Sequence, residues 1–245
     1  MKKIILFVCI YLLSFVPVFS QEVPGSKLDG ILARIDSYRL PPDSMKYTVA
    51  IDVREKEALI SHDTFLISSK GDKSLIEMQS AKSQGQKVLV IDQQMWIKMP
   101  KSSRVIRITP LQRLTGQASF SDLARLQFRE KYTISDAKDV LIGDRKCLGL
   151  ELKAKQKNET YASVYLVVDS ETAYPIKADF FLLSGKKFKS LEFEPPTSVY
   201  GKQINTKYKI YDEMVKDQIT ELTVSNIKLV NIPDYVFAMS YLEGQ

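Results

Sequence analysis

The chain has 245 residues, 44% of them hydrophobic and 26% charged, and its formal net charge is +6. This length suits one large all-β domain or two small ones. The basic excess is mild and is not gathered into a block, so it favours only weak attraction to anionic lipid headgroups or acidic partners.

Residues 1–20 have the three parts of a secretory signal peptide. Lys2 and Lys3 supply the positive charge, residues 4–16 form a continuous apolar stretch, and compact residues precede Gln21. The apolar stretch is short for a membrane span, and no other run is longer. The sequence therefore predicts an exported protein cleaved after Ser20. Export argues against nucleic acid and nucleotide cofactors as partners.

A short amphipathic helix is expected near the start of the mature chain, residues 21–245. Ser26 and Asp29 match the capping pattern S-x-x-D. The apolar face, with the spacing i, i+3, i+4 and i+7, consists of Leu28, Ile31, Leu32 and Ile35. Pro41-Pro42 ends the helix and is expected to act as a stiff hinge, because proline fixes φ.

Strands follow, recognised by apolar residues at every second position. The clearest are 47–54, 147–154 and 203–210, each with one apolar and one solvated face, as in an antiparallel sheet covered on one side. Further strands are expected at 58–68, 73–80, 87–91, 95–99, 104–109, 161–168, 173–183, 187–194 and 219–230. In the last strand the apolar parity changes between Val224 and Ile227, which predicts a β-bulge.

The segment 110–128 interrupts the strands. Residues 110–118 resemble a loop, and 120–128 are expected to form a second short helix with Ser119 or Ser121 as its N-cap. We expect one mainly β domain: a single open, curved antiparallel β-barrel of about 11–12 strands, with short helices covering or plugging its apolar face. Because two short helices provide little apolar cover, either side chains fill the interior or a cavity remains for an apolar ligand.

The inventory of catalytic groups is small. His62 is the only histidine and Cys147 is the only cysteine of the mature chain, so a zinc site of the usual composition is not expected. The sequence has no G-x-S-x-G, P-loop or G-x-G-x-x-G motif. With no second histidine to activate it, Cys147 is interpreted as a buried, inert thiol. We expect no catalytic residues, no metal and no cofactor.

The segment Val88–Pro100, VLVIDQQMWIKMP, resembles the hairpin of LolA-type lipoprotein carriers. It combines an apolar strand, a turn that begins with aspartate and a Trp-bearing strand that ends at proline. Lys101–Ile108 continues as in the broader group of outer-membrane lipoprotein-sorting proteins, and residues 167–169, 174–177 and 232–237 fit as well. The resemblance covers almost the whole mature chain.

This resemblance implies an open, curved β-barrel with a helical lid, which carries lipoproteins by their acyl chains across the periplasm. The implied ligands are lipoprotein acyl chains or phospholipid, and the implied partners are an inner-membrane donor complex and an outer-membrane acceptor. We expect a monomer. The candidate residues for the acyl cavity and its lid are Leu28, Ile31, Leu32, Ile35, Met95, Trp96, Met99, Phe120 and Leu123. Plain core packing is the alternative for Met95, Trp96 and Met99.

The best-known carriers have an arginine near the end of the third strand that controls the opening of the lid. Lys70 occupies the corresponding position here, and Arg104 and Arg107 are further candidates for polar control of the lid. The Gly-Ser-Asp segment often found before the mid-chain helix is only partly kept in residues 116–122. Two alternatives remain open: a sensor or adaptor of the same fold that binds an envelope protein, and an envelope hydrolase that depends on His62.

Overall fold

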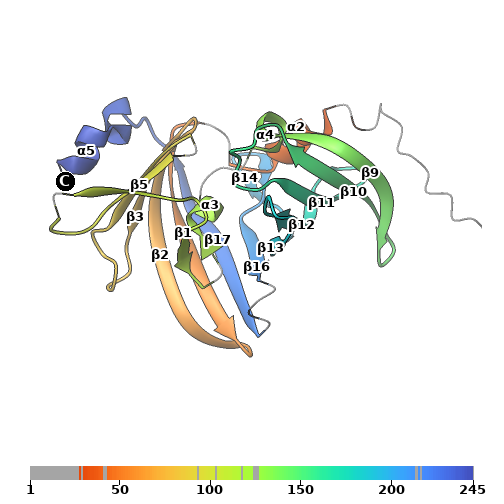
Figure 1. The fold of residues 1–245 in the computed structure, drawn as a ribbon, viewed down its shortest axis with the longest axis horizontal. Coiled ribbons are helices and arrows are strands. Elements are labelled where there is room, and N and C mark those ends of the chain that lie inside the picture. Colours follow the sequence, from red (N-terminus) through yellow and green to blue (C-terminus); the bar gives the residue numbers. More distant parts are fainter. Residues whose placement is uncertain are drawn as a thin grey trace, which may run out of the picture.

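The alternating segments build one antiparallel sheet of 13 strands, which makes up most of the molecule (Figure 1). The structure, a computed structural model, describes residue 28 and residues 30–40, 43–92, 94–102, 104–116, 118–123, 127–212, 215 and 217–244. The predicted signal peptide, the Ser26 and Asp29 cap and the Pro41-Pro42 hinge lie outside the described residues.

The N-terminal half of the sheet is a meander in which each strand pairs with the next. Its strands are β1 (Met45–Glu55), β2 (Ala58–Lys70), β3 (Lys73–Met78), β4 (Lys87–Ile91), β5 (Gln94–Lys98) and β6 (Val105–Ile108). The chain then crosses to the far edge of the sheet and begins a second meander there. Its strands are β9 (Tyr132–Ile142), β10 (Arg145–Ala154), β11 (Ser163–Asp169), β12 (Pro175–Phe181), β13 (Lys187–Phe193), β16 (Lys207–Tyr211) and β17 (Gln218–Leu229).

The pairing of β17 with β1 joins the two meanders into one sheet. The pairing runs from Met45 opposite Leu229 to Glu55 opposite Gln218. The strand order is therefore β6-β5-β4-β3-β2-β1-β17-β16-β13-β12-β11-β10-β9. The edge strands β6 and β9 do not pair with each other, so the curved sheet stays open, as predicted from the sequence.

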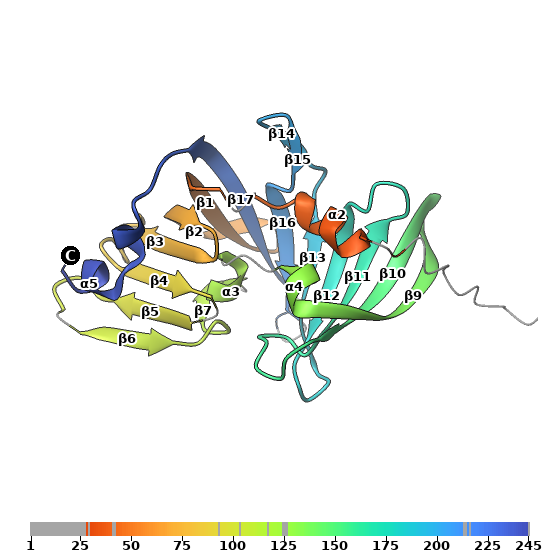
Figure 2. The same ribbon diagram turned by 90° about the horizontal axis from the view of Figure 1, so that it is seen from above.

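The remaining elements are short. They are α2 (Ile31–Ser37), β7 (Arg113–Thr115), β8 (Ala118–Ser119), α3 (Phe120–Leu123), α4 (Phe128–Lys131), the hairpin β14 (Thr197–Val199) and β15 (Lys202–Ile204), the 3₁₀ turn η1 (Asp234–Phe237) and α5 (Met239–Glu243). In the described part of the chain, none of the helices combines the length and apolarity that a membrane crossing requires. Figure 2 shows α2 and α4 near the C-terminal meander and α5 beside the N-terminal one.

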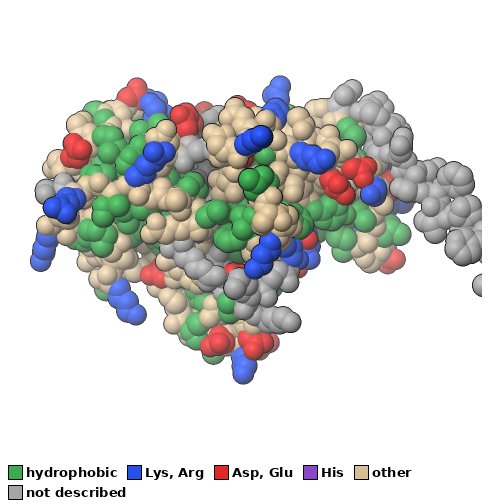
Figure 3. Space-filling model, viewed as in Figure 1, with side chains coloured by type: hydrophobic (Ala, Val, Ile, Leu, Met, Phe, Trp, Pro, Cys, Tyr) green, Lys and Arg blue, Asp and Glu red, His purple; other side chains and the backbone are tan. Residues whose placement is uncertain are grey.

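Two hydrophobic clusters pack against the sheet. The larger cluster includes residues from both meanders, and we call its side the inner face. The smaller one covers the outer face of β3 to β5 with the C-terminal segment 230–242. Strand β4 shows the division: Val88 and Val90 belong to the inner cluster, whereas Leu89 and Ile91 belong to the outer one. On the surface in Figure 3, charges of both signs are interspersed among apolar side chains.

The bulge predicted in the last strand is confirmed. Lys46 pairs with Lys228 and Thr48 pairs with Ser225, so β17 has one extra residue at this point. Asn226 takes up the irregularity with a φ of 53°. The predicted strand 203–210 is divided in two, because Asn205 turns away and its N–H donates to the Tyr38 carbonyl at 2.7 Å.

Three other segments differ from the expectation. The predicted loop 110–118 contains strand β7 and the start of strand β8. The predicted helix 120–128 is represented by two separate single turns, α3 and α4. Strand β9 was missed, although it has 11 residues. Its alternation is interrupted because Asp136 pairs with Glu151 and Ile134 pairs with Leu152, which leaves Ser135 as an extra residue.

Gly116, in the turn between β7 and β8, packs against the central strand pair. Its φ is +53°, and a Cβ atom would lie 2.5 Å from Val53 Cγ2 and 2.6 Å from Thr220 Oγ1. We predict that Gly116→Ala lowers the free energy of unfolding by about 2–4 kcal/mol, because backbone strain and overpacking add.

Gly143→Ala is the matched control, because its φ is +58° but nothing lies within 4 Å of the added Cβ. This variant should lose only about 1 kcal/mol from backbone strain. Urea denaturation of both variants measures the difference. Equal losses would contradict the close packing of the β7–β8 turn on β1 and β17.

Candidate functional site

A cavity of about 140 Å³ lies on the inner face of the sheet. Its wall is mainly aromatic and aliphatic, and it comes from both meanders and from the central strand pair. The apolar lining residues are Leu40, Tyr47, Val49, Met95, Pro110, Phe128, Tyr161, Phe180, Leu191, Phe193, Tyr208, Leu222 and Val224. The strand residues in this wall alternate with residues that point to the other face of the sheet. Tyr47 and Val49, for example, are two positions apart and therefore share one face.

A buried ion pair holds α3 against this wall. The Lys189 ammonium group, on β13, is paired with the Asp122 carboxylate of α3, and both side chains are at most 5% exposed. Asp122 also accepts hydrogen bonds from the N–H and hydroxyl groups of Ser119 at 2.8 and 3.0 Å. The Tyr208 hydroxyl donates to the Asp122 carbonyl at 2.9 Å. These contacts connect a single helical turn to two strands of the sheet.

Aromatic rings surround the Lys189 ammonium group. The ring centroids of Tyr161, Phe188 and Phe180 lie 5.4, 5.8 and 5.9 Å from Nζ, which is the range of cation–π attraction. Burial alone would lower the pKa of Lys189, but the Asp122 carboxylate outweighs this effect and raises it above the ordinary value. Lys189 therefore stays charged inside an aromatic environment.

Helix α2 is fixed to α4 through one carboxylate. Asp36 accepts hydrogen bonds from the N–H groups of Phe128 at 3.0 Å and Arg129 at 2.9 Å, at the start of α4. Burial raises the pKa of Asp36, and these two bonds oppose the shift. Because the two helices contact each other, they form one layer beside the cavity, next to an adjoining groove lined by residues of both.

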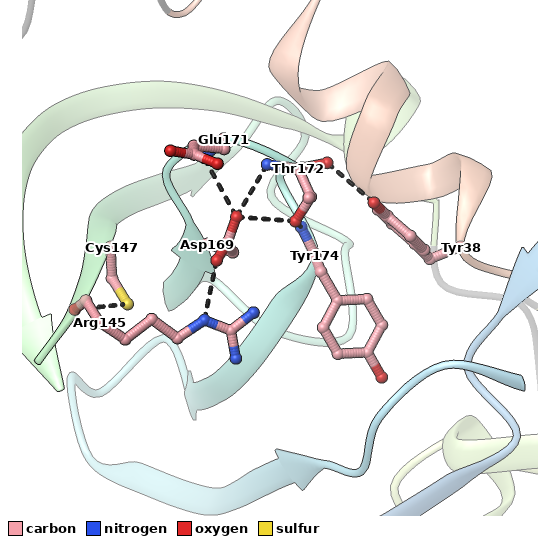
Figure 4. A network of polar contacts seen from close by, with 7 residues as sticks. All are labelled: Tyr38, Arg145, Cys147, Asp169, Glu171, Thr172 and Tyr174. Atoms are coloured by element: carbon pink, nitrogen blue, oxygen red, sulfur yellow. Dashed lines mark hydrogen bonds and ion pairs between the residues drawn. The ribbon is translucent and has the colours of Figure 1, made fainter. Parts of the chain in front are cut away.

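The turn between β11 and β12 is the second anchor of α2 (Figure 4). Tyr38 donates from its hydroxyl to the Thr172 carbonyl at 2.9 Å, and Arg34 donates to the Glu171 carbonyl. Asp169 organises this turn by accepting from the N–H groups of Glu171 and Thr172 at 3.1 and 2.8 Å. Burial would raise the pKa of Asp169, but its hydrogen bonds, including one from Arg145, leave it below the ordinary value.

The predicted helical face is on the inner side of the molecule. Ile31 and Ile35 are buried in the inner cluster, and Leu28 and Leu32 pack against it. These side chains cover the core beside the cavity but are not part of the cavity wall. Phe120 is buried in the same cluster, while the side chain of Leu123 lies outside the described residues.

Met95 and Trp96 are placed on opposite faces of β5. Met95 is buried and lines the cavity, whereas Trp96 packs in the outer cluster with Phe237 and Leu242. Neighbouring residues of a strand point to opposite faces, so both could not line one cavity. Met99 follows the end of β5 and is 39% exposed.

The three candidates for polar control are near or beyond the outer cluster. Lys70 forms an ion pair with Asp234 at 3.0 Å and donates to the Ile232 carbonyl at 3.4 Å. Its contacts therefore hold the C-terminal segment on the outer face. Arg104 and Arg107 are exposed before and on the edge strand β6.

The two residues behind the catalytic alternative, His62 and Cys147, lie on different strands, β2 and β10. His62 Nδ1 lies 2.6 Å from an Asp52 carboxylate oxygen, but its side chain is 56% exposed on β2. Cys147 is buried, burial raises the pKa of its thiol, and Sγ donates to the Arg145 carbonyl at 3.5 Å. Among the residues that the structure describes, no group of three or more His, Cys, Asp or Glu side chains is placed to hold a metal ion.

Comparison with known proteins identifies the class. A LolA superfamily protein from Nitrosomonas europaea is similar at 30% identity, with 87% of this chain and 98% of that one covered and a TM-score of 0.79. A family model described only as an uncharacterised protein matches residues 70–244. The chain has the open, curved sheet of lipoprotein-sorting folds. It belongs to the LolA superfamily.

Two more distant structures share the fold. A DUF1329 family protein from Desulfovibrio piger is 22% identical, with 91% of this chain and all of that chain covered and a TM-score of 0.73. An outer membrane lipoprotein-sorting protein domain from Vibrio parahaemolyticus is 19% identical, with 89% and 97% covered and a TM-score of 0.73. None of the curated proteins matches the sequence.

Sequence reasoning missed the polar residues of the site. Lys189 shares its strand parity with Leu191 and Phe193, both of which line the cavity, so a lysine at an inward position was a usable signal. Its partner Asp122 is 67 positions away and had no comparable signal. Arg39 lines the cavity from the segment after α2, where there is no periodic pattern.

The ion pair at Lys189 yields a prediction about stability. Lys189→Met should lower the free energy of unfolding by about 3 kcal/mol or more, because Asp122 is left as a buried, unpaired charge. Adding Asp122→Asn should restore most of the loss. Lys187→Met on the same strand is the control, and it should lose less than about 1 kcal/mol because Lys187 is 30% exposed. Chemical denaturation that gives similar losses at both lysines would contradict the assigned role.

The outer cluster makes Trp96 a probe of the C-terminal segment. Phe237 is 2% exposed there, so Phe237→Ala should destabilise the segment by about 3–5 kcal/mol and shift Trp96 emission to the red. Tyr235→Ala, in the same turn but 62% exposed, should leave the emission unchanged. Fluorescence and thermal unfolding test both variants. An unshifted Phe237→Ala spectrum would refute the contact.

Proposed function

We propose that the protein binds the acyl chains of lipids or lipoproteins in the inner cavity and carries them through the periplasm toward the outer membrane. The observation that carries this proposal is the apolar cavity, whose wall comes from both meanders and is covered only by short segments. Membership of the LolA superfamily supports it. Such a carrier needs no catalytic group, and we propose no enzymatic activity.

The size of the cavity supports a cover that moves. A cavity of about 150 Å³ holds one benzene molecule, and this one measures about 140 Å³. A long acyl chain therefore needs more space than this cavity offers by itself. We propose that α2 and α3 are the movable cover, with the apolar side chains of Ile31, Ile35 and Phe120 leaving the core when the chain enters.

Burial of the chain supplies the energy for this movement. Each methylene group taken out of water contributes about 0.8 kcal/mol, so a 16-carbon chain gains on the order of 10 kcal/mol before the costs of ordering. Breaking the Lys189–Asp122 pair and displacing α2 consume part of that gain. The same costs favour release when the chain moves to an acceptor.

The cellular setting follows from the predicted leader. We propose cleavage after Ser20, a monomer in the periplasm, an inner-membrane donor complex and an outer-membrane acceptor. The lack of any basic block in the sequence supports lipid rather than nucleic acid as the ligand.

Competition with a fluorescent fatty acid tests the proposal on delipidated protein. Val224→Phe places a ring in the cavity and removes space for about two methylene groups, so affinity should fall about tenfold. Val105→Phe is the control, because Val105 is also partly buried but packs in the outer cluster. It should bind as the unmodified protein does.

A flat titration with the folded, delipidated protein would refute the carrier. If a stable stoichiometric protein partner were then found, the sensor or adaptor alternative would take its place. Equal losses of affinity in Val224→Phe and Val105→Phe would indicate that the fatty acid binds outside the inner cavity.

A further inference from the structure

We propose that Arg39 binds the anionic head, a carboxylate or phosphate, of a single-chain amphiphile whose tail occupies the inner cavity. The inference rests on the proposed acyl-chain binding and narrows its ligand class. It distinguishes a fatty acid or an alkyl phosphate monoester from a long-chain amphiphile with an uncharged head.

Arg39 lies at the boundary between the cavity and the adjoining groove. It follows the C-terminal end of α2 and lines both spaces, together with Leu40. The cavity on one side is mainly apolar. The groove on the other side is lined largely by polar and charged residues, among them Arg129, Lys202 and Gln203. An amphiphile with its tail in the cavity would place its head at this boundary.

The Arg39 guanidinium group has donors to offer. Within the residues that the structure describes, no hydrogen bond or ion pair is formed by this side chain, although it is partly buried. Burial lowers the pKa of Arg39, while the nearby Asp36 carboxylate and the Tyr208 and Tyr47 hydroxyl groups act in the opposite direction. A guanidinium group has five N–H donors and matches a carboxylate or phosphate in a bidentate geometry.

The surrounding charges leave room for an anion. The Asp36 carboxylate, which acts on the pKa of Arg39, already accepts the two N–H groups at the start of α4. Lys131 is the other basic residue that lines the cavity. Its ammonium nitrogen lies 3.6 Å from a carboxylate oxygen of Glu159. In the resting structure, Arg39 is therefore the cation of the wall that an anion can engage without breaking an ion pair, whereas Lys189 is held by Asp122.

The experiment compares three ligands that have the same 16-carbon tail and different head groups. Binding of hexadecanoate, hexadecyl phosphate and hexadecanol is measured by displacement of a fluorescent acyl probe from the full chain and from Arg39→Gln. We expect Arg39→Gln to weaken the two anionic ligands about 10- to 100-fold and to change hexadecanol less than twofold. Arg39→Lys, which keeps the charge but loses the bidentate geometry, should retain part of the affinity for the anions.

Arg54→Gln is the matched control, since it removes the same charge from β1, where the side chain is 40% exposed and paired with Glu221. It should leave all three affinities unchanged. An equal loss of hexadecanol and hexadecanoate in Arg39→Gln would overturn the inference while leaving the carrier intact. Competition by inorganic phosphate alone would also overturn it, because the site would then be a free-anion site. Failure of the unmodified protein to bind any of the three chains would overturn both proposals.

Discussion

The pairing of β1 with β17 is the constraint on which the rest of the molecule depends. It joins strands from opposite ends of the described chain and turns two separate meanders into one sheet. Without it, each meander would be a separate sheet whose apolar face needed its own covering element. With it, the two strands at the centre of the sheet both contribute to the cavity wall: Tyr47 and Val49 from β1, and Leu222 and Val224 from β17. The bulge at Asn226 interrupts the regular pairing on the same strand.

An open sheet of this size needs cover, and the cover here is held by polar contacts more than by length of helix. A single helical turn such as α3 has little stability of its own in water, because helix nucleation is unfavourable. The Lys189–Asp122 pair and the bonds to Asp36 therefore decide where α3 and α4 lie. Contacts of this kind are few and directional, which supports the proposal that the cover separates while the sheet hydrogen bonds remain. Local opening of that sort is typical of binding elements.

The sequence predicted the strands well because their signal is local. Alternation located most of the strands within a few residues, and the parity change in β17 located the bulge. Strand β9 was missed because its own bulge at Ser135 interrupts the alternation. The site was harder to predict, because it depends on which faces and segments meet. Both Met95 and Trp96 are assigned to the acyl cavity from the sequence. Because they are adjacent in a strand, their side chains lie on opposite faces of the sheet. The strand parity of Lys189 marks it as an inward lysine, but nothing in the sequence identifies Asp122, 67 positions away, as its partner.

In the proposed carrier, the inner cavity and Arg39 would have different roles in ligand recognition. Burial of methylene groups gives affinity that grows with chain length but hardly depends on what the chain is attached to. Under this proposal, selection among ligands of equal length would come from the polar boundary, where Arg39 lines both the apolar cavity and the adjoining polar groove. Net affinity also depends on the free-energy cost of moving the cover. If only a small fraction of the molecules has the open, binding-competent form, the apparent affinity is the intrinsic affinity multiplied by that fraction. In the proposed carrier, a resting cavity too small for the chain would keep that fraction low and would let a long acyl chain be released to an acceptor.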